Sequence, residues 1–296
     1  MRWVLFAAFG VVGCKDSKDL DLSCTDEIGY ADASQKAIEG LNAANCYREL
    51  MGLDLGVLDP HLDNASRNHA EYMARQAAIS HHQIDGEPGF TGQWVRDRIV
   101  ESGYDYGPGK SVSEVVAYGH SPVESVDAWI NSVYHRIPFT LPSWLALGFG
   151  HVELYTSMTL VSVWPDGVRT AVIYPANGQT GVNPSFDSDS EMPDPAPDHG
   201  LVGTPITVTV ADVSISGSET NPYSLRLVEA EFSRLGGEPI EALLSDPSTD
   251  DALSQMAVIL PVAPLDPGEQ YTAKMVVEWG GSAQTLTTVF TTGSAP

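Results

Sequence analysis

Through much of the first half of the chain, apolar side chains recur every three or four positions, which is the spacing of one face of a helix. Two segments also carry clear start signals. Asp59-Pro60 combines a capping side chain with a proline shaped for the first helical position, and Ser121-Pro122-Val123-Glu124 forms a capping box. The pattern predicts four helices, over about 34–51, 59–78, 91–102 and 121–133.

From residue 147 onward, apolar positions alternate with polar ones, as they do along a strand with one buried face. Residues 147–163 are rich in Val, Leu, Tyr and Thr and predict two strands, and 168–174 predict a third. The first part of the chain therefore consists of helices followed by an antiparallel sheet, an order typical of stacked layers.

Composition changes between residues 176 and 204, where Asn, Gly, Asp, Ser and Pro dominate, and this predicts an acidic linker between two domains. Beyond it, alternation returns at Ile206, Val208 and Val210 and again over 271–279. The run from Leu265 to Tyr271 resembles the tyrosine corner of immunoglobulin-like and fibronectin-type sandwiches. We expect an α+β protein whose last part, 205–296, is an all-β immunoglobulin-like sandwich.

The chain has 296 residues, of which 43% are hydrophobic, enough to bury the cores of two domains. It carries 39 acidic and 15 basic residues, for a formal net charge of -24. This charge repels phosphate backbones, so nucleic acid is excluded as a partner.

The first 13 residues hold one Arg followed by a short apolar run, which is typical of an export signal. The sequence Val11-Val12-Gly13-Cys14 resembles the lipobox of bacterial lipoproteins, which implies that Cys14 becomes the acylated N-terminus. The alternative is an ordinary cysteine in a conventional signal peptide. With two or more acyl chains the protein would be anchored to a membrane of the cell envelope, on its periplasmic or cell-surface face. Residues 14–30 would be a flexible tether.

Two further cysteines, Cys24 and Cys46, remain in a chain bound for an oxidising compartment. A disulfide would tie the tether to the first helix. The alternative is a buried thiol at Cys46 and a second thiol in a mobile tail.

Candidate chemistry is concentrated at His81, Glu114 and His135, which fall in three separate segments and meet only if the fold brings them to one cleft. Two imidazoles can hold a zinc ion, with a carboxylate nearby to act as a base. The alternative is a hydrogen-bonded network that stiffens the cleft. His69 lies on the apolar face of its helix and is interpreted as a packed core residue.

A series of spaced motifs over about 45–174 resembles the CAP superfamily, the SCP-like domain of cysteine-rich secretory proteins and many bacterial surface proteins. The motifs are Asn45-Cys46-Tyr47-Arg48, Gly52-Leu53, Asn68-His69-Ala70 with Met73, Ser80-His81, Asp85-Gly86, Asp97-Arg98, Gly103-Tyr104, residues 113–119, Trp129 with Ser132 and His135-Arg136, and Gly148-Phe149-Gly150. The resemblance implies a three-layer α-β-α sandwich over 31–175 with a cleft lined by histidines and glutamates. His81 and Glu114 correspond directly to family positions, and His135 to the bacterial variant of the pattern.

Three functions follow from this reading. The first is a tethered binding protein whose cleft takes an apolar or envelope-derived ligand, since family members are linked with sterol, fatty-acid and matrix binding. The second is a metal-assisted hydrolase of peptide or cell-wall material, with zinc on His81 and His135 and Glu114 as the catalytic base. The third is an adhesin or structural envelope protein that acts through its C-terminal sandwich.

Overall fold

The computed structural model describes residues 29–163, 169–212 and 225–294. The predicted signal peptide, Cys14 and Cys24 lie outside these ranges, so the lipid anchor and the Cys24–Cys46 disulfide stay predictions. Cys46 itself is buried in the first helix. Within the described ranges, no helix combines the length and the apolar character needed to cross a membrane.

The first sheet has four strands in the order β1-β3-β4-β2. They are β1 (Val57–Leu58), β2 (Lys110–Tyr118), β3 (Trp144–Val152) and β4 (Tyr155–Val163). The short β1 runs parallel to β3, and the other neighbours are antiparallel. The two strands predicted over 147–163 are therefore β3 and β4.

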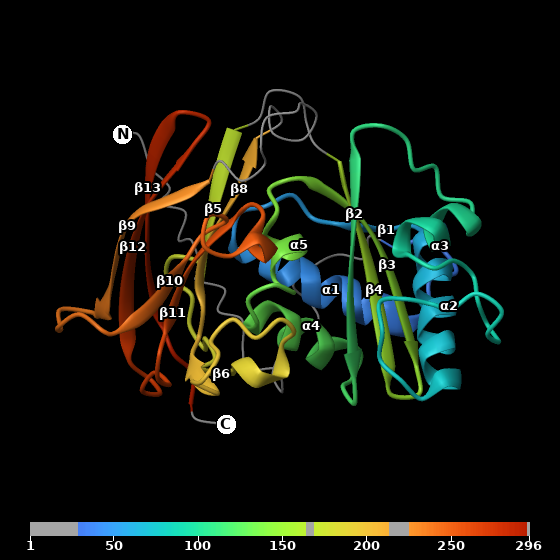
Figure 1. Ribbon diagram of the computed structural model, residues 1–296, viewed down its shortest axis with the longest axis horizontal. Coiled ribbons are helices and arrows are strands. Elements are labelled where there is room, and N and C mark those ends of the chain that lie inside the picture. The colour runs from blue at the N-terminus through green and yellow to red at the C-terminus, as the bar shows by residue number, and fades with distance from the viewer. Residues whose placement is uncertain (1–28, 164–168, 213–224, 295–296) are drawn as a thin grey trace, which may run out of the picture.

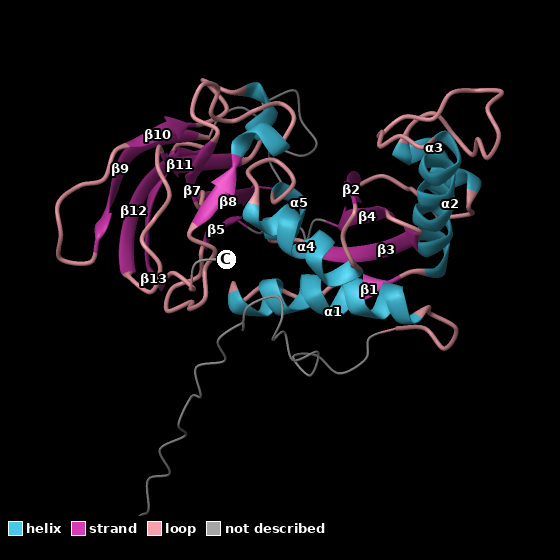
Figure 2. Ribbon diagram, turned by 90° about the horizontal axis from the view of Figure 1, so that it is seen from below, coloured by secondary structure: helices cyan, strands magenta, loops and turns pink. Residues whose placement is uncertain are grey.

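Helices cover both faces of this sheet (Figure 1, Figure 2). On one face lie α2 (Pro60–Gln76) and α3 (Val95–Glu101), and on the other lie α1 (Gln35–Leu50), α4 (Pro122–Asn131) and α5 (Ile137–Thr140). Strand periodicity explains the two cores, because neighbouring residues point to opposite faces: Leu147 packs under α1 and α4, whereas Ala146 packs under α2. The three layers predicted for this part of the chain are present.

The helix start signals predicted at Asp59 and Ser121 form capping hydrogen bonds. The Asp59 carboxylate accepts the N–H groups of His61 and Leu62 at the start of α2. At the start of α4, the Ser121 hydroxyl accepts the Glu124 N–H and the Glu124 carboxylate accepts the Ser121 N–H. The helix predicted from 91 begins only at Val95, because Thr91 is held in the preceding loop by the side chain of Gln83.

The motif Gly148-Phe149-Gly150 sets how closely α2 approaches the sheet. A Cβ on Gly148 would lie 2.1 Å from the backbone carbon of Leu62, and one on Gly150 would lie 2.3 Å from the backbone nitrogen of Arg67. Phe149 points to the other face, where its ring meets Gly40 of α1. Small residues on one face and a ring on the other thus fix both helices against β3.

The motif residues Asn45 and Arg48 connect α1 to neighbouring loops. The Asn45 amide bonds both the N–H and the C=O of Gly56. The fully buried Arg48 guanidinium donates to four carbonyl oxygens, those of Asp54, Phe139, Leu141 and Ser143. Both side chains therefore fix the fold rather than a ligand.

The strand predicted over 168–174 forms as β5 (Arg169–Tyr174), but it does not join the first sheet. It pairs antiparallel with β8 (Ile206–Asp212) in the C-terminal half. Alternation predicts a strand without identifying its partner, so the sequence pattern could not reveal this crossover. The C-terminal half of the fold therefore includes β5, although β5 precedes residues 176–204, the segment that was expected to separate the domains.

Two antiparallel sheets build the C-terminal half. One has the order β10-β11-β8-β5 and the other β13-β12-β9. Val208 of β8 and Ile259 of β11 pack against Met275 and Val277 of β12, so these two sheets share one core. At the predicted tyrosine corner, the Tyr271 hydroxyl accepts the backbone N–H of Asp266 at 2.8 Å. The strands not yet bounded are β9 (Arg226–Arg234), β10 (Ala242–Ser245), β11 (Met256–Pro261), β12 (Gln270–Trp279) and β13 (Ser282–Thr291).

The segment predicted as a linker, 176–204, is folded. It contains the strand pair β6 (Ser185–Asp187) and β7 (Leu201–Gly203), with the 3-10 helix η2 (Ser188–Ser190) between them. Its Phe186 and Val202 share a core with Val133 and with Leu253 of a second 3-10 helix, η4 (Asp251–Leu253). Its composition indicates turns, but a few buried side chains are enough to pack those turns against both halves.

Gly148→Ala tests the close approach of α2 to β3. We expect it to lower the free energy of unfolding by about 2–3 kcal/mol, because the added methyl group overlaps backbone that can only shift as a whole. Gly107→Ala is the matched control, since a Cβ there meets nothing closer than 3.9 Å. Urea unfolding of both variants measures the difference, and equal losses would contradict the packing described.

Candidate functional site

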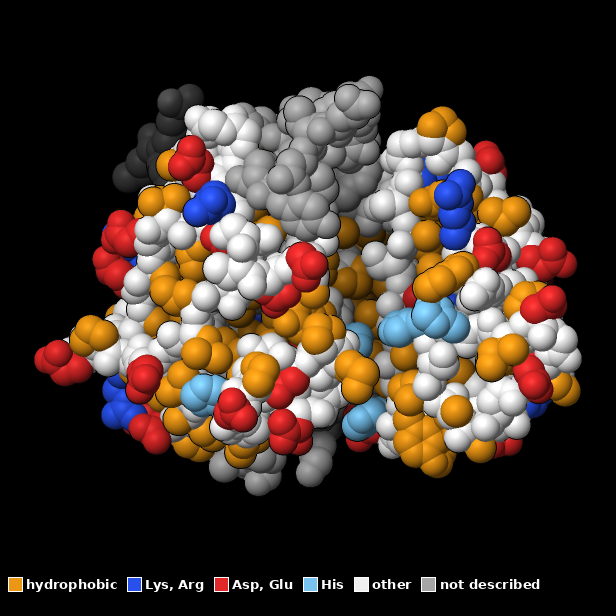
Figure 3. Space-filling model, in the orientation of Figure 1, with side chains coloured by type: hydrophobic (Ala, Val, Ile, Leu, Met, Phe, Trp, Pro, Cys, Tyr) orange, Lys and Arg blue, Asp and Glu red, His pale blue; other side chains and the backbone are white. Residues whose placement is uncertain are grey.

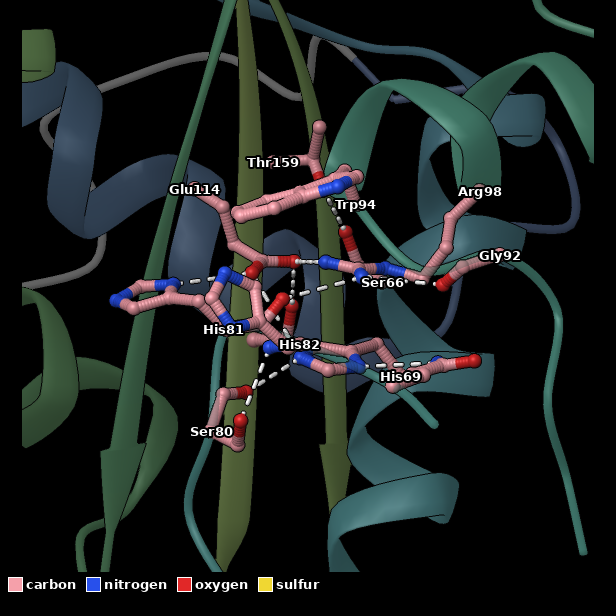
Figure 4. Close-up of polar contacts among 12 residues, drawn as sticks. Ser66, His69, Ser80, His81, His82, Gly92, Trp94, Arg98, Glu114 and Thr159 are labelled. Carbon is pink, nitrogen blue, oxygen red and sulfur yellow. Dashed lines mark hydrogen bonds and ion pairs between the residues drawn. The ribbon is translucent and has the colours of Figure 1, made fainter. Parts of the chain in front are cut away.

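His81 and Glu114 meet on the face of the first sheet that α2 and α3 cover (Figure 4). Strand parity places Glu114 there, since the neighbouring Val115 points into the core under α1. His81 lies in the loop after α2, with its Nδ1 3.1 Å from Glu114 Oε2. Arg98 reaches from α3 and places its Nη2 2.5 Å from Glu114 Oε1. The structure thus joins two of the three predicted site residues and adds an arginine.

The Glu114 carboxylate is buried and ionised. Its side chain is only 3% exposed, and burial alone would raise its pKa. The hydrogen bond from His81 and the charge and hydrogen bond of Arg98 outweigh burial and hold the pKa of Glu114 below its ordinary value. Since an ionised carboxylate only accepts hydrogen bonds, His81 carries its proton on Nδ1.

His69 is held neutral beneath this pair. Its Nε2 lies 2.8 Å from the Ser80 carbonyl oxygen and its Nδ1 lies 3.0 Å from Gln83 Nε2. The Gln83 oxygen accepts the Thr91 N–H, so its NH2 group must face His69, and the proton of His69 is on Nε2. Burial lowers the pKa of His69 to about 4, although the charge of Glu114 acts in the other direction.

Together these contacts brace the loop between α2 and α3. Besides its bond to Glu114, the Arg98 guanidinium donates to the carbonyl oxygens of His81, Gly92 and Gln93. Glu114 also accepts a bond from Ser157. The polar atoms of Glu114, His69 and Arg98 are therefore engaged within the protein. His81 is 49% exposed, and Figure 4 shows its second ring nitrogen pointing away from the cluster.

His135, the third predicted residue, is bound to a different carboxylate. Among the described residues, no hydrogen bond or ion pair joins it to His81 or Glu114, and its Nδ1 lies 2.7 Å from Glu191 Oε1. His135 follows α4, whose apolar side chains pack on the face of the sheet opposite α2 and α3. The described part of the chain contains no group of three or more His, Cys, Asp or Glu residues positioned to hold a metal ion.

Glu191, from the predicted linker, holds the exit of α4. Its carboxylate accepts the backbone N–H groups of Val133, Tyr134 and His135 at 2.7, 2.8 and 2.9 Å. Burial would raise the pKa of Glu191, but the His135 imidazole and these N–H groups hold it below its ordinary value. Nothing in the acidic run around Glu191 distinguishes it from its neighbours, so sequence reasoning missed it.

A cleft of about 1050 Å³ lies between the two halves. Figure 3 shows the surface hollowed between them, with histidine side chains at the hollow. One wall comes from α4 and the end of β2, and the other from the segment 179–191 with Gly293 and Ser294. Its described lining includes His135, but neither His81 nor Glu114, and has no Lys or Arg. Five aromatic and four acidic residues line it: Tyr47, Tyr118, Trp129, Tyr174 and Phe186, with Glu124, Asp127, Asp187 and Glu191.

Asp127 is an unusual carboxylate at the wall of this cleft. Its residue is 8% exposed and its Oδ1 accepts the Tyr47 hydroxyl at 2.8 Å. Its Oδ2 is buried and has no hydrogen-bond partner among the described residues. Burial raises the pKa of Asp127 to about 6. The sequence offered a signal for it, because Asp127 falls on the apolar face of its helix beside Val126 and Ile130.

A family model described as the cysteine-rich secretory protein family, CAP, covers α2 to α5 and the four strands of the first sheet. Residues 41–183 match the CAP family. This CAP segment includes β1 to β4 of the first sheet, β5, and residues 179–183 of the cleft wall.

Solved structures resemble part of this chain at low identity. An extracellular protein containing an SCP domain from Bacillus anthracis is 18% identical, with a TM-score of 0.37, over 43% of this chain and 40% of that one. An outer surface protein from Borrelia burgdorferi is 17% identical, with a TM-score of 0.34, over 44% of this chain and 91% of that one. The match spans less than half the length of the first structure. Among curated proteins, none matches this chain.

Glu114→Gln tests the brace in the CAP segment. It leaves the buried Arg98 without a counterion, so we expect a loss of about 3–5 kcal/mol in the free energy of unfolding at pH 7. Glu71→Gln, which breaks exposed pairs with Arg67 and Arg75, should cost less than about 1 kcal/mol. Urea unfolding compares the two, and a loss in Glu114→Gln no larger than in the control would show that the cluster does not stabilise the fold.

Asp127→Asn tests the burial of the cleft carboxyl. A carboxyl whose pKa rises from 3.8 to about 6 on folding destabilises the protein where it is ionised, by about 3 kcal/mol at 1.36 kcal/mol per pKa unit. This penalty is absent below pH 3.8 and grows as the pH rises to about 6. The Asn variant should therefore gain stability over the native protein at pH 8 and lose that advantage near pH 4. Asp85→Asn, at an exposed loop position, should show no such gain; a pH-independent difference for Asp127→Asn would refute this account.

Proposed function

We propose that the protein is an exported, lipid-anchored binding protein that takes an apolar or envelope-derived ligand in the cleft between α4 and the segment 179–191. The observation that carries this proposal is the cleft of about 1050 Å³ with aromatic side chains in its walls. A volume of that order is typical of small-molecule sites, and here aromatic rings and carboxylates line it together.

The cleft is held in shape by contacts between the two halves. The buried Arg136 guanidinium, next to the cleft residue His135, donates to the carbonyl oxygen of Pro205 and packs on the ring of Tyr174. Glu191 fixes the loop after α4 from the other side. A preformed site loses little conformational entropy when a ligand binds, which favours binding as its role.

The contacts of the His81 cluster support bracing rather than chemistry. The His81 and His135 imidazoles are each bound to a different carboxylate, Glu114 and Glu191. Glu114, the proposed base, is ion-paired with Arg98. A general base must reach the proton that it removes, and this carboxylate is directed to its neighbours instead.

The anchor and the class of the sandwich belong to the same proposal. The lipobox-like Val11–Cys14 supports acylation at Cys14, and fractionation of cells carrying Cys14→Ser would test it, since release from the membrane fraction is expected. The hydroxyl contact of Tyr271 supports an immunoglobulin-like sandwich, which here supplies part of the cleft wall.

Blocking the cleft tests the binding function. Ala128 is an exposed residue of α4 in the cleft wall, so Ala128→Trp should fill the space without disturbing the core. The protein is incubated with an envelope lipid extract, purified again, and its retained ligand is measured by mass spectrometry. We expect at least a tenfold loss of retained ligand in Ala128→Trp.

Ala283→Trp, on the exposed part of β13 and outside the cleft lining, is the matched control and should retain ligand like the native protein. Retention of no ligand by the native protein, or equal retention by Ala128→Trp, would overturn the proposed function.

A further inference from the structure

We infer that the ligand of the cleft is an organic cation, an ammonium group on an apolar body, and that Asp127 is the side chain that selects its charge. The inference rests on the proposed function, because it names the chemical class of the ligand for the same cleft.

The charge of the lining favours a cation. The described residues around the cleft include Glu124, Asp127, Asp187 and Glu191, and no Lys or Arg. A concave site with one sign of charge concentrates ligands of the opposite sign and repels those of the same sign. An anionic ligand such as a fatty-acid carboxylate would therefore enter against repulsion from several carboxylates.

Asp127 is the carboxylate with an unmet interaction. Glu191 is fully occupied by the loop after α4, and Glu124 accepts the Ser121 N–H at the start of that helix. In Asp127, only Oδ1 has a hydrogen-bond partner among the described residues, the Tyr47 hydroxyl. A buried acceptor without a partner destabilises the fold, and an ammonium N–H that bonded to it would remove this penalty. A neutral ligand without a donor would leave it in place.

The aromatic walls suit the same class of ligand. Tyr47 contacts Asp127 directly, its ring packs edge-on against Tyr174, and Tyr118 lies 52% exposed at the cleft. Aromatic faces attract ammonium groups through their negative potential and also cover an alkyl body. Carboxylate and rings together therefore favour an alkylammonium over an inorganic cation, which would gain nothing from the apolar surface.

The experiment compares three probes that share an eight-carbon chain and differ in charge: octylammonium, octanol and octanoate. Each is titrated calorimetrically into the full mature chain. We expect octylammonium to bind at least tenfold more tightly than octanol, and octanoate to bind more weakly than octanol. In Asp127→Asn, the ratio of the octanol Kd to the octylammonium Kd should fall from ten or more to about one.

Asp85→Asn, which also removes one carboxylate but lies outside the cleft lining, should keep the full ratio. If all three probes bind the native protein equally, the inference is overturned while the binding function stands. Binding of none of the three overturns both. A ratio that survives in Asp127→Asn shows that the overall acidity, rather than Asp127, selects the cation, and it removes this assignment.

Discussion

The arrangement of the two halves depends on one buried carboxylate. Glu191 accepts three consecutive backbone N–H groups at the exit of α4 and also binds the His135 imidazole. These donors converge because the chain turns sharply after the helix, and a carboxylate is the side chain that can accept them all. Since α4 forms one wall of the cleft and the segment around Glu191 forms the other, the same interaction sets the distance between them.

Local features were predictable from the sequence, and long-range partners were not. The caps at Asp59 and Ser121 and the contact at Tyr271 involve residues within five positions of each other, so pattern and composition indicate them. The proximity of His81 and Glu114 came from the family resemblance. By contrast, the pairing of His135 with Glu191 and of β5 with β8 depends on which surfaces meet after folding, and no local pattern encodes that choice.

Buried polar groups serve two different purposes in this molecule. In the CAP segment, Glu114 and Arg98 satisfy each other, His69 bonds Ser80 and Gln83, and the result is a stiff loop. At the cleft, Asp127 keeps an oxygen without a protein partner at a net loss of stability. A fully satisfied network is typical of architecture, whereas an unsatisfied group in a concave surface is typical of a place where something else completes the bonding.

The crossover of β5 limits how this protein can be divided or recombined. Because β5 is the edge strand next to β8, a C-terminal fragment that begins after residue 175 would lack β5. The N–H and C=O groups of β8 that pair with β5 would then be exposed. Such an edge readily pairs with another copy. The sandwich is therefore not separable from the CAP segment. Any fragment that carries the complete sandwich into a fusion has to begin before Arg169, inside the segment that matches the CAP family.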